Sequence, residues 1–157
     1  MKNVEIISKT DVLNNGVLFD GDLVDYESIT ACLLCDSSSG NQIPITGLVY
    51  ELYSNGNLDY YCNYENGLKN GDYVMFFEDG KIKSFVTMYQ GVSHGTEIHW
   101  HRNGNMKSES ITKYGYDMAK RVWNESGELI AETTEPNDLA KAMIEKYEKL
   151  RGRANNA

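Results

Sequence analysis

The sequence is poor in cysteine and has no long apolar run. Its three cysteines, an odd number in 157 residues, do not suggest a disulfide framework, and we expect a reducing cytoplasm. Cys32 and Cys35 form a C-x-x-C pair in an apolar stretch without further ligands nearby, which favours buried thiols over a redox or zinc site. Residues 1–7 are too short and too polar for a signal peptide, and no segment is expected to cross a membrane.

Positive charge is also scarce. The chain has 23 acidic and 15 basic side chains, which gives a net charge of −8. That balance argues against nucleic acid as a partner, because binding to nucleic acid depends on clustered Lys and Arg. It also argues against binding to an anionic membrane surface. It suits a basic protein partner, since opposite charge speeds encounter and rejects wrong partners. The simpler alternative is that the charge only keeps the chain soluble.

Catalytic signatures are missing as well. The sequence contains no G-x-S-x-G, no H-E-x-x-H and no P-loop motif. We therefore predict that the protein is not an enzyme, with no catalytic residues and no cofactor.

Glycine, in contrast, recurs with a fixed spacing of 24 residues. Three interleaved series follow this spacing: Gly47, Gly71 and Gly95; Gly56, Gly80 and Gly104; Gly67, Gly91 and Gly115. A fixed period of this kind indicates one small unit copied along the chain. Such units cannot bury an apolar face alone, so they stack into an extended surface, which favours binding over catalysis.

Each unit is predicted to be a β-hairpin. Asn55-Gly56, Asp79-Gly80 and Asn103-Gly104 stand between two β-rich runs, at turns where both residues can take positive φ. The glycines that open each unit are expected between hairpins, in joining loops such as 65–70. A shorter fourth unit, with Met118 in place of its first glycine, completes an antiparallel meander of about eight strands, which forms a curved, twisted sheet.

Alternation along the first strands assigns their side chains to two faces. One face is apolar and aromatic: Tyr50, Leu52, Val74, Phe76, Ile98 and Trp100. The other face is aromatic and amphipathic: Val49, Glu51, Tyr53, Tyr73, Met75, Phe77, Glu97, His99 and His101. The strands carry too few large residues for a sandwich core, so we predict a single sheet covered by other parts of the chain.

We predict one mainly β domain over residues 1–157, with an N-terminal cap at 1–45, repeats at 46–133 and a C-terminal helix at 134–153. Within the cap, two or three short strands are expected among the apolar runs 4–7, 17–19 and 30–34, which are broken by turn signals at 14–16 and 20–21, and a loop is expected at 36–42. Such a cap would cover the first edge of the repeat sheet.

The C-terminal helix is predicted from a change of period. Pro136 would lie in its first turn with Thr134 or a neighbour as cap, and Gly152 would end it before a frayed tail at 154–157. Four residues fall on one helical stripe that would pack on the sheet: Leu139, Met143, Tyr147 and Leu150.

The unit G-x-x-x-x-[YFW]-x-x-[ND]-G-x-[LIM] resembles the MORN repeat, and its bacterial variant of about 24 residues in particular. Its core is Asn55-Gly56-Asn57-Leu58, Asp79-Gly80-Lys81-Ile82-Lys83 and Asn103-Gly104-Asn105-Met106-Lys107. The resemblance extends over residues 43–131 and leaves the first 42 uncovered. It implies a meander of hairpins, and it implies a function, because many small bacterial proteins of this group are the antitoxin or immunity partner of a polymorphic toxin.

Candidate partner-binding residues are those that vary between the repeat copies, because the glycines serve the scaffold. Tyrosines are favoured at interface hot spots, and acids suit a basic partner. The predicted set is Glu51, Tyr53, Asp59, Tyr61, Tyr73, Phe77, Glu97, His99 and His101. The alternative is that the rings pack against the chain's own flanks and that the acids form a solvated rim.

Glu97, His99 and His101 also have the side chains of a zinc site. Side chains two positions apart on a strand lie roughly 7 Å from each other, which three-ligand sites seldom use, so we predict no metal.

Together these features predict an immunity protein that binds a cognate toxin, basic and nuclease-like, and blocks its active or substrate-binding surface. One alternative is a scaffold protein whose repeats hold other proteins or lipids; lipid binding would need a basic patch, which the net charge opposes. A third is a metal-dependent hydrolase that uses Glu97, His99 and His101.

Overall fold

A computed structural model describes residues 4–19, 24–27, 32–36 and 41–154. Its two helices are α1 (Lys9–Asn15) and α2 (Asp138–Ala154). Its strands are β1 (Val17–Leu18), β2 (Val24–Glu27), β3 (Cys32–Asp36), β4 (Gln42–Pro44), β5 (Gly47–Leu52), β6 (Leu58–Glu65), β7 (Leu68–Phe76), β8 (Ile82–Tyr89), β9 (Val92–Trp100), β10 (Met106–Lys113), β11 (Tyr116–Trp123) and β12 (Leu129–Thr133).

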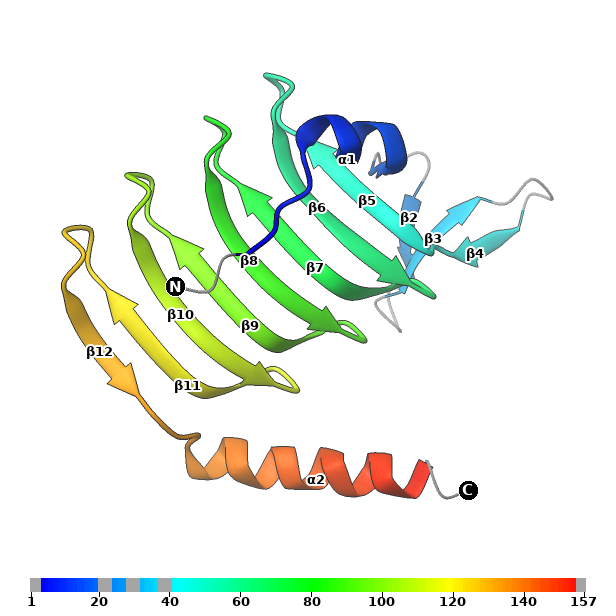
Figure 1. Ribbon diagram of the computed structural model, residues 1–157. Helices are drawn as coiled ribbons and strands as arrows, with labels where there is room; N and C mark the ends of the chain where they lie inside the picture. Colours follow the sequence, from blue (N-terminus) through cyan, green and yellow to red (C-terminus); the bar gives the residue numbers. More distant parts are fainter. Residues whose placement is uncertain (1–3, 20–23, 28–31, 37–40, 155–157) are drawn as a thin grey trace.

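The repeats form one open, nine-stranded sheet in the order β1-β5-β6-β7-β8-β9-β10-β11-β12 (Figure 1). Every pair from β5 to β12 is antiparallel, and each strand is joined to the next by a turn, as in a meander. The predicted all-β class, antiparallel hairpin repeats and C-terminal helix are confirmed. A second sheet, β2-β3-β4, carries the C-x-x-C pair in strand β3.

Two kinds of turn alternate along the meander. The tight turns have two central residues with positive φ, for example Asn66 at 49° and Gly67 at 78°, followed by Gln90-Gly91 and Tyr114-Gly115. This is the hairpin turn whose twist matches the flanking strands. The wide turns hold Gly56, Gly80, Gly104 and Gly127, which have positive φ, whereas the preceding residues do not.

The turn chemistry predicted from sequence was therefore partly wrong. Asn55-Gly56 and its copies do form hairpin turns, but the double positive φ belongs to the other glycine series. The opening glycines also lie elsewhere than predicted: Gly71 and Gly95 are inside strands β7 and β9, with φ of 99° and 130°. A Cβ on Gly95 would lie 3.2 Å from the Cβ of Thr87, so glycine relieves both backbone strain and crowding there.

Hydrogen bonds link each repeat to the next at both ends of the sheet. At the tight turns, the backbone N–H of Gly67, Gly91 and Gly115 donates to the carbonyl of Ile45, Lys69 and Ser93 at 2.7, 2.9 and 2.8 Å. At the wide turns, the amides of Asn55 and Asn103 donate to the carbonyls of Glu78 and Glu125, both at 2.9 Å. The 24-residue period therefore builds a scaffold in which each turn fixes its neighbour.

One face of the sheet, here called the α1 face, is covered by α1. Val12 of α1 is fully buried, and the Tyr61 hydroxyl accepts a hydrogen bond from the backbone N–H of Ile7 at 3.0 Å. The buried residues of this cluster are Val12, Leu58, Tyr61, Val74 and Phe85, with Tyr50, Leu52, Phe76 and Trp100 packed around them. The predicted division of side chains between two faces is confirmed, and so is the need for cover.

The N-terminal segment contains a helix that the sequence reading missed. Residues 4–7 are not a strand but lead into α1, whose N-cap Ser8 accepts from the N–H of Asp11 at 3.1 Å. The S-x-x-D pattern of such a cap is visible in the sequence. Strand β1 pairs with β5 and so closes that sheet edge, as predicted for a cap. The predicted turn at 20–21 and parts of the predicted 30–34 strand and 36–42 loop lie outside the described residues.

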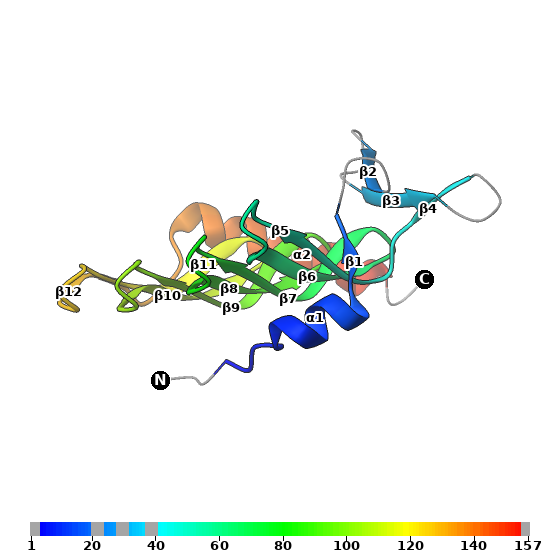
Figure 2. The same ribbon diagram turned by 90° about the horizontal axis from the view of Figure 1, so that it is seen from above.

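Helix α2 lies on the opposite side of the sheet from α1 (Figure 2), but several of its predicted details were wrong. It begins after Asn137, whose side chain accepts from the N–H of Ala140, so Pro136 precedes the helix. Gly152 lies inside it. Of the predicted stripe, Tyr147 does pack on the sheet, with its ring centre 5.4 Å from that of Tyr114. The buried residues are instead Ala140 and Ile144, one position after Leu139 and Met143, while Leu139 is 67% exposed and Leu150 is 51% exposed.

Candidate partner-binding face

The face of the nine-stranded sheet opposite α1 is covered by α2 over only part of its area (Figure 2); it is here called the open face, and it carries most of the predicted partner-binding residues. Glu51, Tyr73, Glu97 and His99 alternate onto it within strands β5, β7 and β9. Tyr53, Phe77 and His101 occupy equivalent positions directly after those strands, at the start of the wide turns. The repeat geometry thus brings into one surface residues that lie up to 50 positions apart in the sequence.

The first repeat contributes an acidic cluster to the open face. Burial and the nearby charge of Asp59 raise the pKa of Glu51. Burial and a hydrogen bond to Asp59 raise the pKa of Tyr53 to about 12, and its hydroxyl lies 2.9 Å from the carbonyl of Phe76. Burial is the first cause of both shifts and the negative charge of Asp59 adds to it, so a cation from a partner would be stabilised at this position.

The second repeat contributes aromatic rings, each with a cation beside it. The Nζ of Lys69 lies 3.7 Å from the ring centre of Tyr73, and the guanidinium of Arg102 lies 5.1 Å from that of Phe77. Tyr73 also packs edge-on against Tyr60 at 5.7 Å. The sequence predicted the rings but not the cations beside them. Lys69 lies at another position of strand β7, and Arg102 belongs to the next repeat.

The third repeat contributes the histidines. His99 Nε2 lies 2.8 Å from Glu97 Oε1, and this hydrogen bond lowers the pKa of Glu97. His101 Nε2 instead lies 3.0 Å from the carbonyl oxygen of Trp123. The three side chains therefore do not converge, and within the described residues no group of three or more His, Cys, Asp or Glu side chains could hold a metal ion.

Tyr61 does not belong with the other predicted residues. It alternates onto the α1 face and is 0% exposed beneath α1 and the segment before it. Its inclusion in a partner-binding surface is therefore corrected. Alternation puts Tyr60 and Tyr61 on opposite faces, but only the packing of a distant helix decides which of the two rings is buried.

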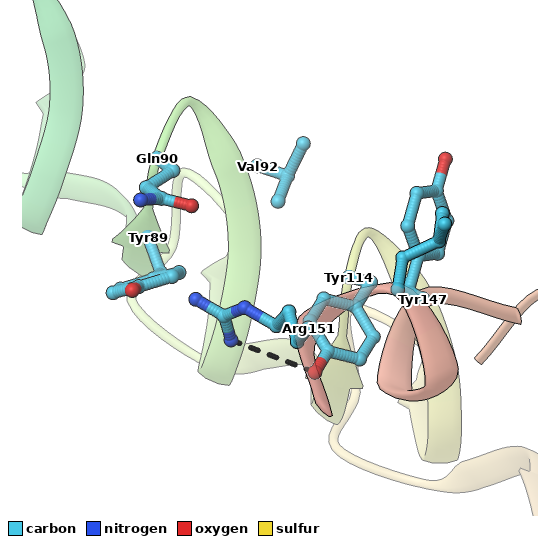
Figure 3. A pocket seen from close by; sticks show the side chains of 7 residues that line it. Tyr89, Gln90, Val92, Tyr114, Tyr147 and Arg151 are labelled. Carbon is cyan, nitrogen blue, oxygen red and sulfur yellow. Dashed lines mark hydrogen bonds between the residues drawn. The ribbon is translucent and has the colours of Figure 1, made fainter. Parts of the chain in front are cut away.

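A recess lies under α2, and it was not predicted from the sequence. It is a cleft of about 370 Å³ lined by residues that include Tyr89, Tyr114, Tyr147 and Arg151 (Figure 3). The guanidinium of Arg151 lies 4.4 Å from the ring centre of Tyr89 and 5.5 Å from that of Tyr114. An ion pair between Lys113 and Glu148 also ties α2 to the sheet. These contacts hold the helix in place.

The hairpin scaffold and its sequence pattern define a class. Residues 45–66 and 93–114 match the MORN repeat variant family, and the two segments begin 48 residues apart, twice the glycine period. These two segments of the chain are therefore similar to the MORN repeat variant, in agreement with the resemblance seen in the glycine spacing.

A curated relative shares part of this sequence. The chain is 41% identical over 46 residues to the protein named Immunity protein YwqK of Bacillus subtilis (strain 168). The match spans 29% of this chain and 30% of the relative's length. No solved structure matches the chain. In the described ranges, neither helix is long and apolar enough to cross a membrane.

Proposed function

We propose that this protein is an immunity protein that binds a cognate toxin through its open face and blocks the toxin's active or substrate-binding surface. The observation that carries the proposal is the similarity to a protein named as an immunity protein, in a chain whose repeats build an extended surface. Because the match covers under a third of either chain, the toxin and its chemistry are inferred from the surface itself.

The open face suits a basic partner. The chain carries a net charge of −8, and the crowded carboxylates of Glu51 and Asp59 favour an incoming cation. The rings of Tyr53, Tyr73 and Phe77 supply large contact area with little loss of conformational entropy. A basic, nuclease-like toxin would present the complementary charge that this surface needs.

In this proposal the protein inhibits the toxin by covering its surface and catalyses no reaction. Inhibition needs only that the toxin's functional surface be covered, so the proposal requires no catalytic residue, cofactor or metal. It also sets the place of action: the protein would work in the cytoplasm, where a toxin that attacks cellular components must be neutralised.

Isothermal titration against the toxin encoded beside this gene tests the proposal. We expect binding well below micromolar, and a loss of about tenfold or more for Tyr53→Ala or Glu51→Gln. Glu5→Gln, the same loss of charge at an exposed residue before α1, is the matched control and should bind normally. Absence of submicromolar binding by the folded wild-type protein would remove the immunity function.

A scaffold that organises other proteins or lipids is the second candidate, because MORN repeats also fit it. Flotation with anionic liposomes separates the two. An immunity protein of this charge should stay in the soluble fraction, whereas co-flotation would favour the scaffold.

A further inference from the structure

A cleft of about 410 Å³ lies on the α1 face beyond the region that α1 covers. Helix α1 and the segment before it cross in front of β5–β8, while β10–β12 extend past them (Figure 1). The cleft is lined by Trp100, Met106, Glu109 and Trp123, together with glycines and an asparagine of the wide turns. We call it the tryptophan cleft, because it contains both tryptophans of the chain.

The repeat register brings the two indoles to the same face. Ile98 and Arg121 both pair with Glu109, and Trp100 and Trp123 follow them two positions later along β9 and β11. The equivalent residues of the first two repeats, Leu52 and Phe76, belong to the cluster under α1. Trp100 also packs against the edge of that cluster, whereas Trp123, one repeat further along, does not belong to it.

Glu109 gives the cleft a charge. Its side chain is half-buried, and within the described part of the chain it has neither a hydrogen bond nor an ion pair. Arg121 lies opposite Glu109 on β11, but its Nε donates to Glu132 at 2.7 Å instead of forming an ion pair with Glu109. The hydrogen bond to Glu132 raises the pKa of Arg121, and the charge of Glu109 contributes to that shift. A half-buried carboxylate beside two indoles is stabilised by an incoming cation.

Elsewhere this protein places a cation against partly buried aromatic rings. Lys69 lies 3.7 Å from the Tyr73 ring centre, and Arg151 lies 4.4 Å from that of Tyr89. No such cation lies over Trp100 or Trp123 among the described residues, although indole attracts cations more strongly than phenol does. The tryptophan cleft thus has aromatic rings that can attract a cation, and no cation of the described residues lies over them.

We propose that the tryptophan cleft binds an arginine side chain presented by a basic protein partner. A guanidinium is planar, stacks on indole and can donate two parallel hydrogen bonds to the Glu109 carboxylate, which an ammonium cannot do. The net charge of −8 favours a basic partner over an acidic one. The proposal rests on the proposed function only for the partner's identity as a toxin, and it adds a second contact on the face away from Glu51 and Tyr53.

Intrinsic fluorescence reports on this site directly, since both tryptophans line it. The probe is N-acetyl-arginine amide, compared at constant ionic strength with its neutral isostere N-acetyl-citrulline amide. We expect a saturable fluorescence change for the arginine probe and about tenfold weaker binding for citrulline. Equal responses to the two probes, or no saturable response to arginine, would overturn the proposal.

Variants of the protein test, in the same titration, whether the Glu109 carboxylate binds the arginine probe. Glu109→Gln should weaken the arginine probe about tenfold, while Glu78→Gln, an equal charge change at an exposed wide turn of another repeat, should not. Circular dichroism confirms that each variant is folded. If Glu109→Gln binds like wild type, the carboxylate is not the anchor and the proposal fails.

The two proposals can fail separately. The arginine titration needs no toxin, so a positive result without toxin binding would retain the cleft and reject the immunity function. Toxin binding that is unaffected by Glu109→Gln, together with a negative titration, would retain the immunity function and reject the cleft.

Discussion

Two substitutions in α2 test which side of that helix packs on the sheet. Ile144 is 8% exposed and Leu139 is 67% exposed, so truncating each to alanine removes three carbons from opposite environments. At about 0.8 kcal/mol per buried methylene, plus a cavity contribution and less a few tenths for alanine's helix propensity, Ile144→Ala should cost about 2–3 kcal/mol. Leu139→Ala should cost about 0.5 kcal/mol, since two thirds of the side chain is already in water.

The assay must detect α2 itself, because a terminal helix can open without global unfolding. Hydrogen exchange of the α2 amides in native buffer measures that local opening, and urea unfolding followed by far-ultraviolet circular dichroism measures the global loss. We expect faster α2 exchange for Ile144→Ala and near wild-type exchange for Leu139→Ala. Equal effects, or a larger effect at Leu139, would refute the packing deduced from the buried Ala140 and Ile144 and restore the stripe predicted from sequence.

Three further predictions concern other parts of the fold. Val12→Ala should lower the free energy of unfolding by about 2 kcal/mol in urea, because Val12 is fully buried against the α1 face; a loss below about 0.5 kcal/mol would mean that α1 is not packed there. Gly95→Ala should lower the melting temperature more than Gly104→Ala, since both residues have positive φ but only Gly95 also has a neighbouring side chain within 4 Å; equal shifts would contradict the crowding at Thr87. Burial and two nearby cations lower the pKa of His94 below 6.5, so its contribution to stability is complete above pH 6.5 and is lost as the pH falls through the folded-state pKa. Histidine NMR titration, with urea midpoints for wild type and His94→Gln on both sides of pH 6.5, measures this effect, and a folded-state pKa at or above 6.5 would disprove it.

Local chemistry explains why much of the fold was predictable. Hairpin turns depend on a few neighbouring residues, and strand alternation is a property of the backbone, so the glycine series and the apolar pattern predict the meander and its two faces. The turn types were confused because both glycine series have positive φ, and only the geometry of Asn66, Gln90 and Tyr114 distinguishes them.

The candidate site was less predictable, because a binding residue must be exposed as well as placed on the correct face. Glu51, Tyr53 and Phe77 lie on the open face as predicted. Tyr61 does not, since its hydroxyl accepts from Ile7, 54 residues earlier in the chain. The partners of the other rings also come from afar: Arg102 reaches Phe77 from the next repeat. No local pattern specifies such contacts.

The chain alone determines the period, the hairpins, the antiparallel order and the alternation of side chains, because each follows from backbone geometry within one repeat or between adjacent ones. Only the tertiary structure decides which face is covered, which side of α2 is buried and where two tryptophans meet Glu109. Those outcomes depend on segments far apart in sequence that dock on the sheet. The repeat therefore supplies the surface, and the flanking helices decide which parts of it remain free to bind.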